Sequence, residues 1–449
     1  MIRLFIVVAF ALAAPIAARA QTGQWVVVTD RWGNKEYSTL NLAADGKIVT
    51  GDWDGDALTG TVRGTRFQLT VKDARGTSYG FEGEAGRDGL SGTADFPDGN
   101  NPVARVRHAF TARRVPDRPP GGPRVHDFRP TDYANSFTPD RPPVLTIWPG
   151  DTVRTTTIDS GGMDAQGVTR ALFGNPQTGP FFIAGAAQGD TVIVHIKRLR
   201  LNRDWADSLD TIVGRALGSS LVPEAGKLGK PVRWRLDRSA GYATPEGATG
   251  ALRNFRVPVR PMLGGLALAN GFGAPPLSTG DTGRAGGNMD FPEVVEGNSV
   301  WLPVQQPGGL LYLGDAHARQ GDGETSQYAL ETSMDVEFTV ELIKRKTVPM
   351  PRVEIPHRAD GARPGRLARR GAQTGEHRAD PVAPPGLWAE PLRSGASDGS
   401  RGALHRPQSR WAERRRGGAD RQGIAAGSGR AIGSDFFSLP SPRTCSGVH

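Results

Sequence analysis

The stretch DALTGT at residues 56–61 returns as DGLSGT at residues 88–93, and this internal echo indicates a β-meander. Around both copies, short runs rich in β-branched and aromatic residues alternate with Asp-Gly, Arg-Gly and Asn-Gly turns at a spacing of about ten residues. Such spacing is typical of short antiparallel strands. Residues 21–115 are therefore predicted to form a small all-β module, either a barrel or a sandwich.

The composition of the whole chain agrees with a strand-rich protein. Its 449 residues include 60 Gly and 35 Pro, which favour many short strands and turns over long helices. The length suggests two or three domains. The chain holds one cysteine, Cys445, so an internal disulfide, a cysteine-ligated zinc cluster and an iron–sulfur site are excluded within it.

The net charge of +9 is concentrated near the end of the chain. Residues 351–449 carry 17 Arg, no Lys and 9 acidic residues, whereas residues 1–350 have a net charge of only +1. We therefore expect no nucleic-acid partner for the body of the protein. Residues 356–449 are predicted to be a frame-shifted translation of a GC-rich gene or, alternatively, a disordered basic tail. Sequencing the gene across codon 355 separates these two hypotheses.

The first 20 residues have the features of a secretory signal peptide. Arg3 is followed by an apolar run at residues 4–14, and Ala18-Arg19-Ala20 is a small-x-small cleavage site. An apolar run of this length is too short to span a membrane comfortably. We expect a periplasmic or secreted protein with no stable membrane insertion.

A second, larger β-rich domain is predicted to follow the module. Residues 116–143 are rich in proline and indicate a linker or an extended wrapping arm, and residues 144–355 again alternate strand-like runs with Gly-Asp turns. Within them, apolar residues at helical spacing predict an amphipathic helix from Asp204 to Ala216. Strands are expected at Leu310–Gly314 and Tyr328–Ile343.

Two Gly-rich acidic loops carry the side chains best suited to chemistry. They are GGNMD at residues 286–290 and GDAHARQGDGE at residues 314–324. Of the four histidines that precede residue 351, His317 alone lies in a Gly-rich loop among carboxylates. Asp, His and Glu together suit zinc or another divalent ion, and a further carboxylate could relay a proton. From spacing alone, a plain acidic turn is an open alternative.

Taken together, several pieces of residues 144–355 resemble the acetamidase/formamidase family. The matching pieces occur in the family's order and end in a long, specific motif. They are PGDTV (149–153), TID (157–159), NPQTGP (175–180), GAAQGD (185–190), GGNMD (286–290), LPV (302–304), GDAHARQGDGE (314–324) and Glu331. The module at residues 21–115 is an addition to the family's usual core.

This resemblance implies a mainly β protein with few helices, in which a larger sandwich domain follows the small meander or barrel. It also implies a homo-oligomer that hydrolyses short aliphatic amides such as formamide and acetamide with a divalent metal, expected to be zinc. Glu331 is read as either a metal ligand or a structural strand residue. The implied metal ligands are Asp159, Asp290 and His317; the implied catalytic residues are Glu324 as general base with Asp322 and Gln320; and the implied substrate-binding residues are Asn288 and Met289.

A different class of function fits the same residues. The added β-module favours a non-catalytic envelope binding protein built on the same scaffold. An amidase with a cysteine nucleophile is excluded within this chain, because Cys445 lies in the Arg-rich tail. Alanine at His317 or Glu324 distinguishes the two functions. It should abolish hydrolysis, whereas a binding role should be largely unaffected.

Overall fold

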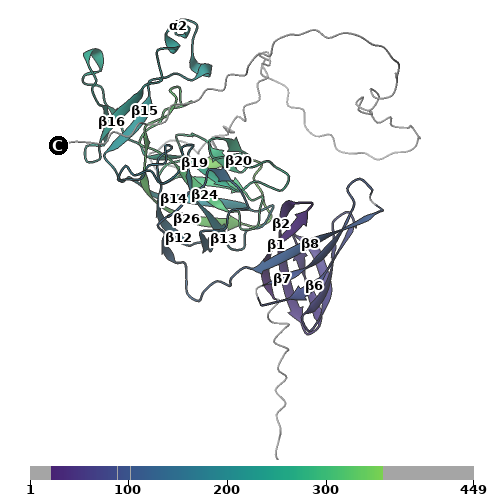
Figure 1. Cartoon of the computed structure of the whole chain (residues 1–449). Coiled ribbons are helices and arrows are strands. Elements are labelled where there is room, and N and C mark those ends of the chain that lie inside the picture. Colours follow the sequence, from purple (N-terminus) through teal and green to yellow (C-terminus); the bar gives the residue numbers. More distant parts are fainter. Residues whose placement is uncertain (1–21, 88, 102, 357–449) are drawn as a thin grey trace, which may run out of the picture. The chain divides into compact units, whose positions relative to one another are not determined.

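The computed structural model describes residues 22–87, 89–101 and 103–356, and strands are the main secondary structure of this part of the chain (Figure 1). The predicted signal peptide and the Arg-rich tail beyond residue 356 lie outside the described residues. The described helices are single turns: η1 (Gly214–Ala216), α2 (Val222–Ala225) and η2 (Gly250–Leu252). The expectation of a mainly β protein with few helices is confirmed.

The first eight strands form a closed antiparallel barrel, drawn in purple to blue in Figure 1. Each strand pairs with the next, and β1 also pairs with β8, which closes the barrel. The small module is therefore a barrel and not a sandwich. Its strands are β1 (Gly23–Arg31), β2 (Asn34–Asp45), β3 (Ile48–Trp53), β4 (Asp56–Arg63), β5 (Arg66–Lys72), β6 (Ser78–Ala85), β7 (Leu90–Pro97) and β8 (Arg105–Arg114).

Aromatic side chains fill the barrel interior. Along β5 every second residue is buried, as expected for a strand with one face inside and one in solvent. The rings of Trp53 and Phe81 stack with centroids 4.1 Å apart. Phe81 also meets Phe96 and Phe110 edge to face. The interior is a packed hydrophobic core, so it accounts for the stability of the module.

The Pro-rich segment at residues 116–143 is a wrapping arm. Two short strands in it pair with the larger domain: β9 (Val125–Asp127) runs parallel to β12, and β10 (Ser136–Phe137) pairs with β20 (Leu277–Ser278). Proline has no backbone N–H to donate, so it suits this extended course with few pairings. Of the two readings from the sequence, the arm fits the structure better than a free linker.

Two sheets build the larger domain. The six-stranded sheet has the order β27-β23-β14-β26-β12-β9, and the eleven-stranded sheet contains β13, β19 and β24. The remaining strands of the six-stranded sheet are β12 (Thr152–Thr156), β14 (Thr191–Leu201), β23 (Ser299–Pro303), β26 (Met334–Ile343) and β27 (Arg352–Glu354). Those of the other sheet are β11 (Leu145–Ile147), β13 (Gln177–Ile183), β15 (Trp205–Leu209), β16 (Pro231–Asp237), β17 (Tyr242–Pro245), β18 (Val257–Pro258), β19 (Met262–Leu268), β21 (Thr282–Gly283), β22 (Gly286–Asn288), β24 (Leu311–His317) and β25 (Glu331–Thr332).

One hydrophobic core joins these sheets. Buried residues of both contribute to it, for example Val194 and Phe338 from one sheet and Leu266 and Leu313 from the other. All seven residues of β19 and all seven of β24 are buried. The polar side chains of β24 therefore lie inside the protein beside β19, and this is where the candidate site is found.

The predicted helix at Asp204–Ala216 is wrong. Residues 205–209 form β15, which pairs with β16 on one side and β25 on the other, and only Gly214–Ala216 make a turn of 3₁₀ helix. Helical and alternating spacings cannot be told apart over so few apolar residues. Residues 205–209 form a strand because they pair on both sides with segments distant in sequence. β15, β16 and α2 are drawn in teal in Figure 1.

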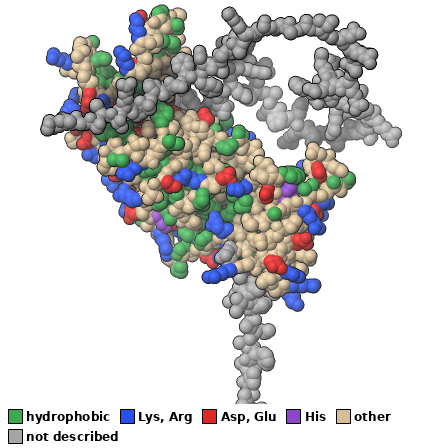
Figure 2. Space-filling model, viewed as in Figure 1, with side chains coloured by type: hydrophobic (Ala, Val, Ile, Leu, Met, Phe, Trp, Pro, Cys, Tyr) green, Lys and Arg blue, Asp and Glu red, His purple; other side chains and the backbone are tan. Residues whose placement is uncertain are grey.

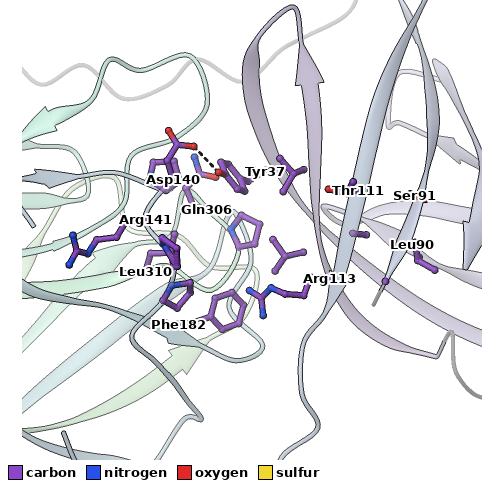
Figure 3. Close-up of a pocket in the computed structure, with 18 of the residues that line it drawn as sticks. Tyr37, Leu90, Ser91, Thr111, Arg113, Asp140, Arg141, Phe182, Gln306 and Leu310 are labelled. Atoms are coloured by element: carbon purple, nitrogen blue, oxygen red, sulfur yellow. Dashed lines mark hydrogen bonds between the residues drawn. The ribbon is translucent and has the colours of Figure 1, made fainter. Parts of the chain in front are cut away.

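Through β1 and β2 the barrel contacts both the larger domain and the Pro-rich segment at residues 116–143. The Gln24 Oε1 atom accepts a hydrogen bond from the Gly185 N–H at 3.0 Å, and the Tyr37 hydroxyl donates to Asp140 at 2.7 Å. A cavity of about 560 Å³ lies beside these contacts, with Arg113 on the barrel side and Phe182 on the other (Figure 3). Its lining residues belong to neither of the two acidic loops.

The visible surface carries charges of both signs. Figure 2 shows Lys and Arg side chains interspersed with Asp and Glu, in keeping with a body whose net charge is close to zero. Every helix in the described part of the chain falls short of the length and apolar character needed to cross a membrane.

Candidate metal centre and active site

A glycine on β19 makes room for a group of acidic side chains. A side chain at Gly264 would place its Cβ 2.5 Å from Asp315 Oδ2, 2.6 Å from Asp290 Oδ1 and 2.9 Å from His317 Cε1. Real Cβ contacts are not this short, so any side chain at position 264 would force these groups to move. The three functional groups therefore converge over a bare stretch of backbone.

Asp290, Asp315 and His317 each offer one ligand atom, and the three atoms lie within 4.8 Å of one another. Asp315 and His317 are two residues apart on β24, so both side chains project from the same face of the sheet. Asp290 follows β22, whose neighbour in the sheet is β19. Both aspartates have a positive φ, 43° for Asp290 and 53° for Asp315, an uncommon backbone state that often marks functional sites.

Gln320 fixes the orientation of the His317 ring. Its Oε1 atom lies 2.7 Å from His317 Nδ1, and its Nε2 atom donates to the Asp290 carbonyl at 2.5 Å. Because the amide oxygen can only accept, Nδ1 carries the proton. Nε2 is then turned toward the carboxylates, 3.2 Å from Glu331 Oε1 and 3.4 Å from Asp315 Oδ1.

The atoms that face the centre lack hydrogen-bond partners. Buried polar atoms are normally paired, yet four atoms around this point are not. They are Asp290 Oδ1, Asp315 Oδ1, His317 Nε2 and Glu331 Oε2. Carboxylate oxygens and one imidazole nitrogen are the donors that zinc and similar divalent ions take. The residues present therefore fit a divalent ion.

The electrostatics of the site reflect several buried acids that share one histidine. Burial and then the charge of Asp315 raise the pKa of Asp290 to about 6, and burial likewise raises the pKa of Asp315. Burial alone would lower the pKa of His317, but the charges of Glu331 and Asp315 outweigh it and raise that pKa well above 6.5. A cation bound among these groups would favour the ionised carboxylates and so lower their pKa values.

Glu324 is a half-buried carboxyl near Asp290, and its pKa is unusually high. Burial and the charge of Asp290 raise its pKa to about 8. A segment from another part of the chain holds its loop: Arg215 donates to the Gly323 carbonyl at 2.8 Å, and the Val213 N–H donates to the Thr325 carbonyl at 3.0 Å. A half-buried carboxyl with a pKa near neutrality suits a general acid or base.

Asn288 completes the group beside Asp290. Its Nδ2 atom donates to Asp290 Oδ2 at 2.8 Å, while its Oδ1 atom is buried without a partner. Met289, between them in sequence, packs against the hydrophobic core. Asn288 therefore leaves one acceptor free in the site, next to an apolar side chain.

The structure brings most of the predicted site residues together, but not all of them. Asp290, His317, Gln320, Asn288 and Glu324 meet as described. Asp322 is exposed in the loop before Glu324. Asp159 is not in the ligand group: its carboxylate pairs with Arg203, with Oδ2 and Nη1 2.8 Å apart.

The sequence interpretation missed Gly264 and Asp315 and left Glu331 undecided. Residues 314–324 were expected to be one loop, whereas the structure continues β24 as far as His317. The alternation of Asp315 and His317 was the signal that could have placed both side chains on one face. Gly264 gave no comparable signal, because its role depends on strands far apart in sequence.

Comparison with known proteins points to the same segment. Residues 273–360 match the model of the Acetamidase/Formamidase family. A protein of Schizosaccharomyces pombe named as a formamidase is 40% identical over 60 residues, which are 13% of this chain and 15% of that relative. The chain thus spans about one seventh of the length of the curated relative it matches.

Two solved structures are also similar to parts of this chain. A predicted acetamidase/formamidase of Thermoanaerobacter tengcongensis is 25% identical, with a TM-score of 0.43 and coverage of 52% of this chain and 74% of that one. An acetamidase of Yersinia enterocolitica is 28% identical, with a TM-score of 0.44 and coverage of 53% and 73%. The family match is the finding that bears on the site, since residues 273–360 hold Asp290, Asp315, His317 and Glu324.

Proposed function

We propose that this protein is a metal-dependent amidohydrolase that cleaves the C–N bond of short linear amides of the formamide and acetamide type. One observation carries the proposal. Three ligand atoms of Asp290, Asp315 and His317 converge over Gly264, and these three residues lie within residues 273–360, which match the Acetamidase/Formamidase family. Zinc is the ion we favour, because a mixed set of carboxylate and imidazole donors is common at catalytic zinc sites.

A divalent ion held by these three residues would polarise a carbonyl and acidify a water molecule. Gln320 keeps His317 Nε2 available, because its Oε1 atom accepts a hydrogen bond from the Nδ1–H group and so keeps the proton on Nδ1. Asn288 Oδ1, which has no partner, is suited to accept an N–H of the amide group. Met289 supplies an apolar contact for a short acyl chain.

Glu324 is proposed to move the protons of the reaction. It takes a proton from the attacking water as the C–O bond forms, and it gives that proton to the nitrogen as the C–N bond breaks. The balance is one amide and one water in, and one carboxylate and one ammonium out. A pKa of about 8 without a cation, lowered by a cation nearby, keeps Glu324 able to both accept and release a proton near neutrality.

Ammonia release from formamide and acetamide tests this function directly. The full chain, loaded with Zn²⁺, is expected to release ammonia, and a chelator is expected to stop it. No release from a folded, zinc-loaded protein would contradict the proposal and favour the non-catalytic binding protein. The His317→Ala variant separates the two functions, because a binding role elsewhere on the molecule would survive it.

We also propose that the protein works in the periplasm or outside the cell and assembles as a homo-oligomer. The first proposal is supported by the sequence of residues 1–20 and the second by the family resemblance. A mature N-terminus at Gln21, found by mass spectrometry, is the result expected for secretion. Light scattering of the purified protein measures the number of copies in the assembly.

A further inference from the structure

A buried ion pair lies next to the candidate metal centre. Arg203 and Asp159 are 2.8 Å apart, and their side chains are only 1% and 4% exposed. The guanidinium also lies on the ring of Trp205, 3.4 Å from its centroid. Both charges are thus removed from water and oriented by their neighbours.

The Nη2 and Nε atoms of Arg203, which do not contact Asp159, bind the two-residue strand β25. Nη2 donates to the Glu331 carbonyl at 3.1 Å, and Nε donates to Thr332 Oγ1 and to the Trp205 carbonyl, each at 3.1 Å. Glu331 and Thr332 are the whole of β25. One buried side chain therefore makes a hydrogen bond to each residue of this strand.

β25 carries a carboxylate into the site. Glu331 pairs with His317 across β24 and with Asp207 across β15. Its Oε1 atom lies 3.2 Å from His317 Nε2, and its Oε2 atom is buried without a partner. The position of this carboxylate depends on a strand too short to hold itself in place.

Buried ion pairs seldom add net stability, because removing two charges from water offsets their attraction. Their effect is more often geometric, and the planar, five-donor guanidinium is well suited to fixing several groups at once. Here the groups fixed are the backbone and hydroxyl of β25 on one side and Asp159 on the other.

We propose that the Arg203–Asp159 ion pair is a positioning device that holds Glu331 against His317, so that Glu331 serves as a further oxygen donor to the bound cation. This inference rests on the proposed function and deepens it. It gives Asp159 a role outside the ligand group and assigns Arg203 a role that no sequence motif indicated. Both act through Glu331 and touch neither the cation nor the substrate.

Cobalt binding provides the test, because Co²⁺ replaces Zn²⁺ at such sites and its visible absorption reports the ligands around it. The full chain, stripped of metal, is titrated with Co²⁺ alongside four variants. Glu331→Gln removes the donor. The double variant Asp159→Asn/Arg203→Met removes both buried charges together, and Arg203→Lys keeps the charge but loses the fork of donors.

The fourth variant, Arg233→Met, is a matched control. Arg233 lies over the same Trp205 ring at 4.1 Å and pairs with Asp207, yet it makes no hydrogen bond to β25 in the described residues. Its removal perturbs the same neighbourhood without touching the Glu331 backbone. Circular dichroism of every variant reports whether the fold is kept.

The expected result is a roughly 10- to 100-fold loss of Co²⁺ affinity in Glu331→Gln and in the double variant, with an altered absorption spectrum. Arg203→Lys is expected to lie between them and the wild type, and Arg233→Met to match the wild type. Wild-type affinity and spectrum in the folded double variant would overturn the inference and leave the proposed function intact. If the double variant does not fold, wild-type binding by Arg203→Lys overturns it instead. Absence of Co²⁺ binding by the wild type overturns both.

Discussion

Strands β5 and β24 carry opposite kinds of side chain at their buried positions. In the barrel, β5 points Phe67, Leu69 and Val71 inward, and the interior is filled by packed rings and aliphatic groups. In the larger domain, β24 is buried along its whole length, yet it carries Asp315 and His317 side by side. The same architecture thus contains a region built for packing and a region that keeps polar groups together at a cost in stability.

This difference between the two strands points to the larger domain as the location of the candidate site. Buried acids without partners are destabilising, and they persist only where something offsets the cost. In the barrel, the half-buried Asp54 carboxylate accepts the Thr39 N–H at 2.7 Å and so closes a turn. Around Gly264, in contrast, the orphaned atoms face one another, which is the arrangement a cation would satisfy.

The largest effect is expected from Glu324→Gln. Loss of the group that moves protons should lower kcat for formamide by about 10²- to 10⁴-fold, while the uncharged side chain leaves the fold intact. Asp322→Asn tests the catalytic role that the family resemblance implies for Asp322; because this side chain is exposed in the same loop, we expect the variant to keep wild-type activity. Steady-state ammonia release measures both variants. Equal losses in the two would remove Glu324 from the proposed role.

Gly264→Ala should empty the site without unfolding the barrel. The added methyl group would sit 2.5 Å from Asp315 Oδ2, so the carboxylates must move apart and Zn²⁺ affinity should fall at least about tenfold. Gly218→Ala is the control, because a Cβ at Gly218 meets open space. Metal content after dialysis, measured by mass spectrometry, compares the two. A Gly264→Ala protein that keeps its zinc would argue against this location for the ion.

Metal and pH should act together on the larger domain. The folded-state pKa of Asp290, about 6, lies above its ordinary value of 3.8, so without metal this group favours folding below pH 3.8 and loses that contribution as pH rises through 6. A bound cation favours the charged form and should cancel the loss. Free Zn²⁺ at 100 times its Kd should add about 2.7 kcal/mol to the free energy of unfolding.

Hydrogen exchange of β24 peptides at pH 5 and pH 7.5, with Zn²⁺ or with chelator, measures this effect. Barrel peptides serve as the internal control, since the proposed ion does not touch them. A pH response that zinc leaves unchanged would contradict the assignment.

The smallest effect is expected in the barrel. Burial raises the pKa of Asp54 to about 6, so its contribution to stability is complete below pH 3.8 and declines as pH rises through 6. Asparagine tolerates the positive φ of Asp54. The Asp54→Asn variant should therefore have a free energy of unfolding about 1–2 kcal/mol higher at pH 8, and nearly the wild-type value at pH 4. Exchange rates of barrel peptides at the two pH values test this. A variant less stable at pH 8 would show that the Thr39 hydrogen bond outweighs burial.

Part of the candidate site was predictable because it lies in one stretch of chain. Gln320 and Glu324 follow His317 within a single acidic loop, and Asn288 and Asp290 share another, so local sequence was enough to single them out. The motif around Asp159 gives no sign of its ion pair with Arg203, which lies 44 residues later in the chain. A carboxylate's role depends on its nearest charge, and that neighbour is set by the fold.

By itself, the sequence determined the strand-rich character of the protein, the meander of the first module and the two acidic loops that hold most of the candidate site residues. These features follow from local alternation, turn residues and composition, which act over a few residues. Only the tertiary structure decided that the module closes into a barrel, that residues 205–209 form a strand, and that Gly264 leaves room for Asp290, Asp315 and His317. Each of these depends on pairing between segments distant in sequence, where burial and hydrogen bonding outweigh local preference.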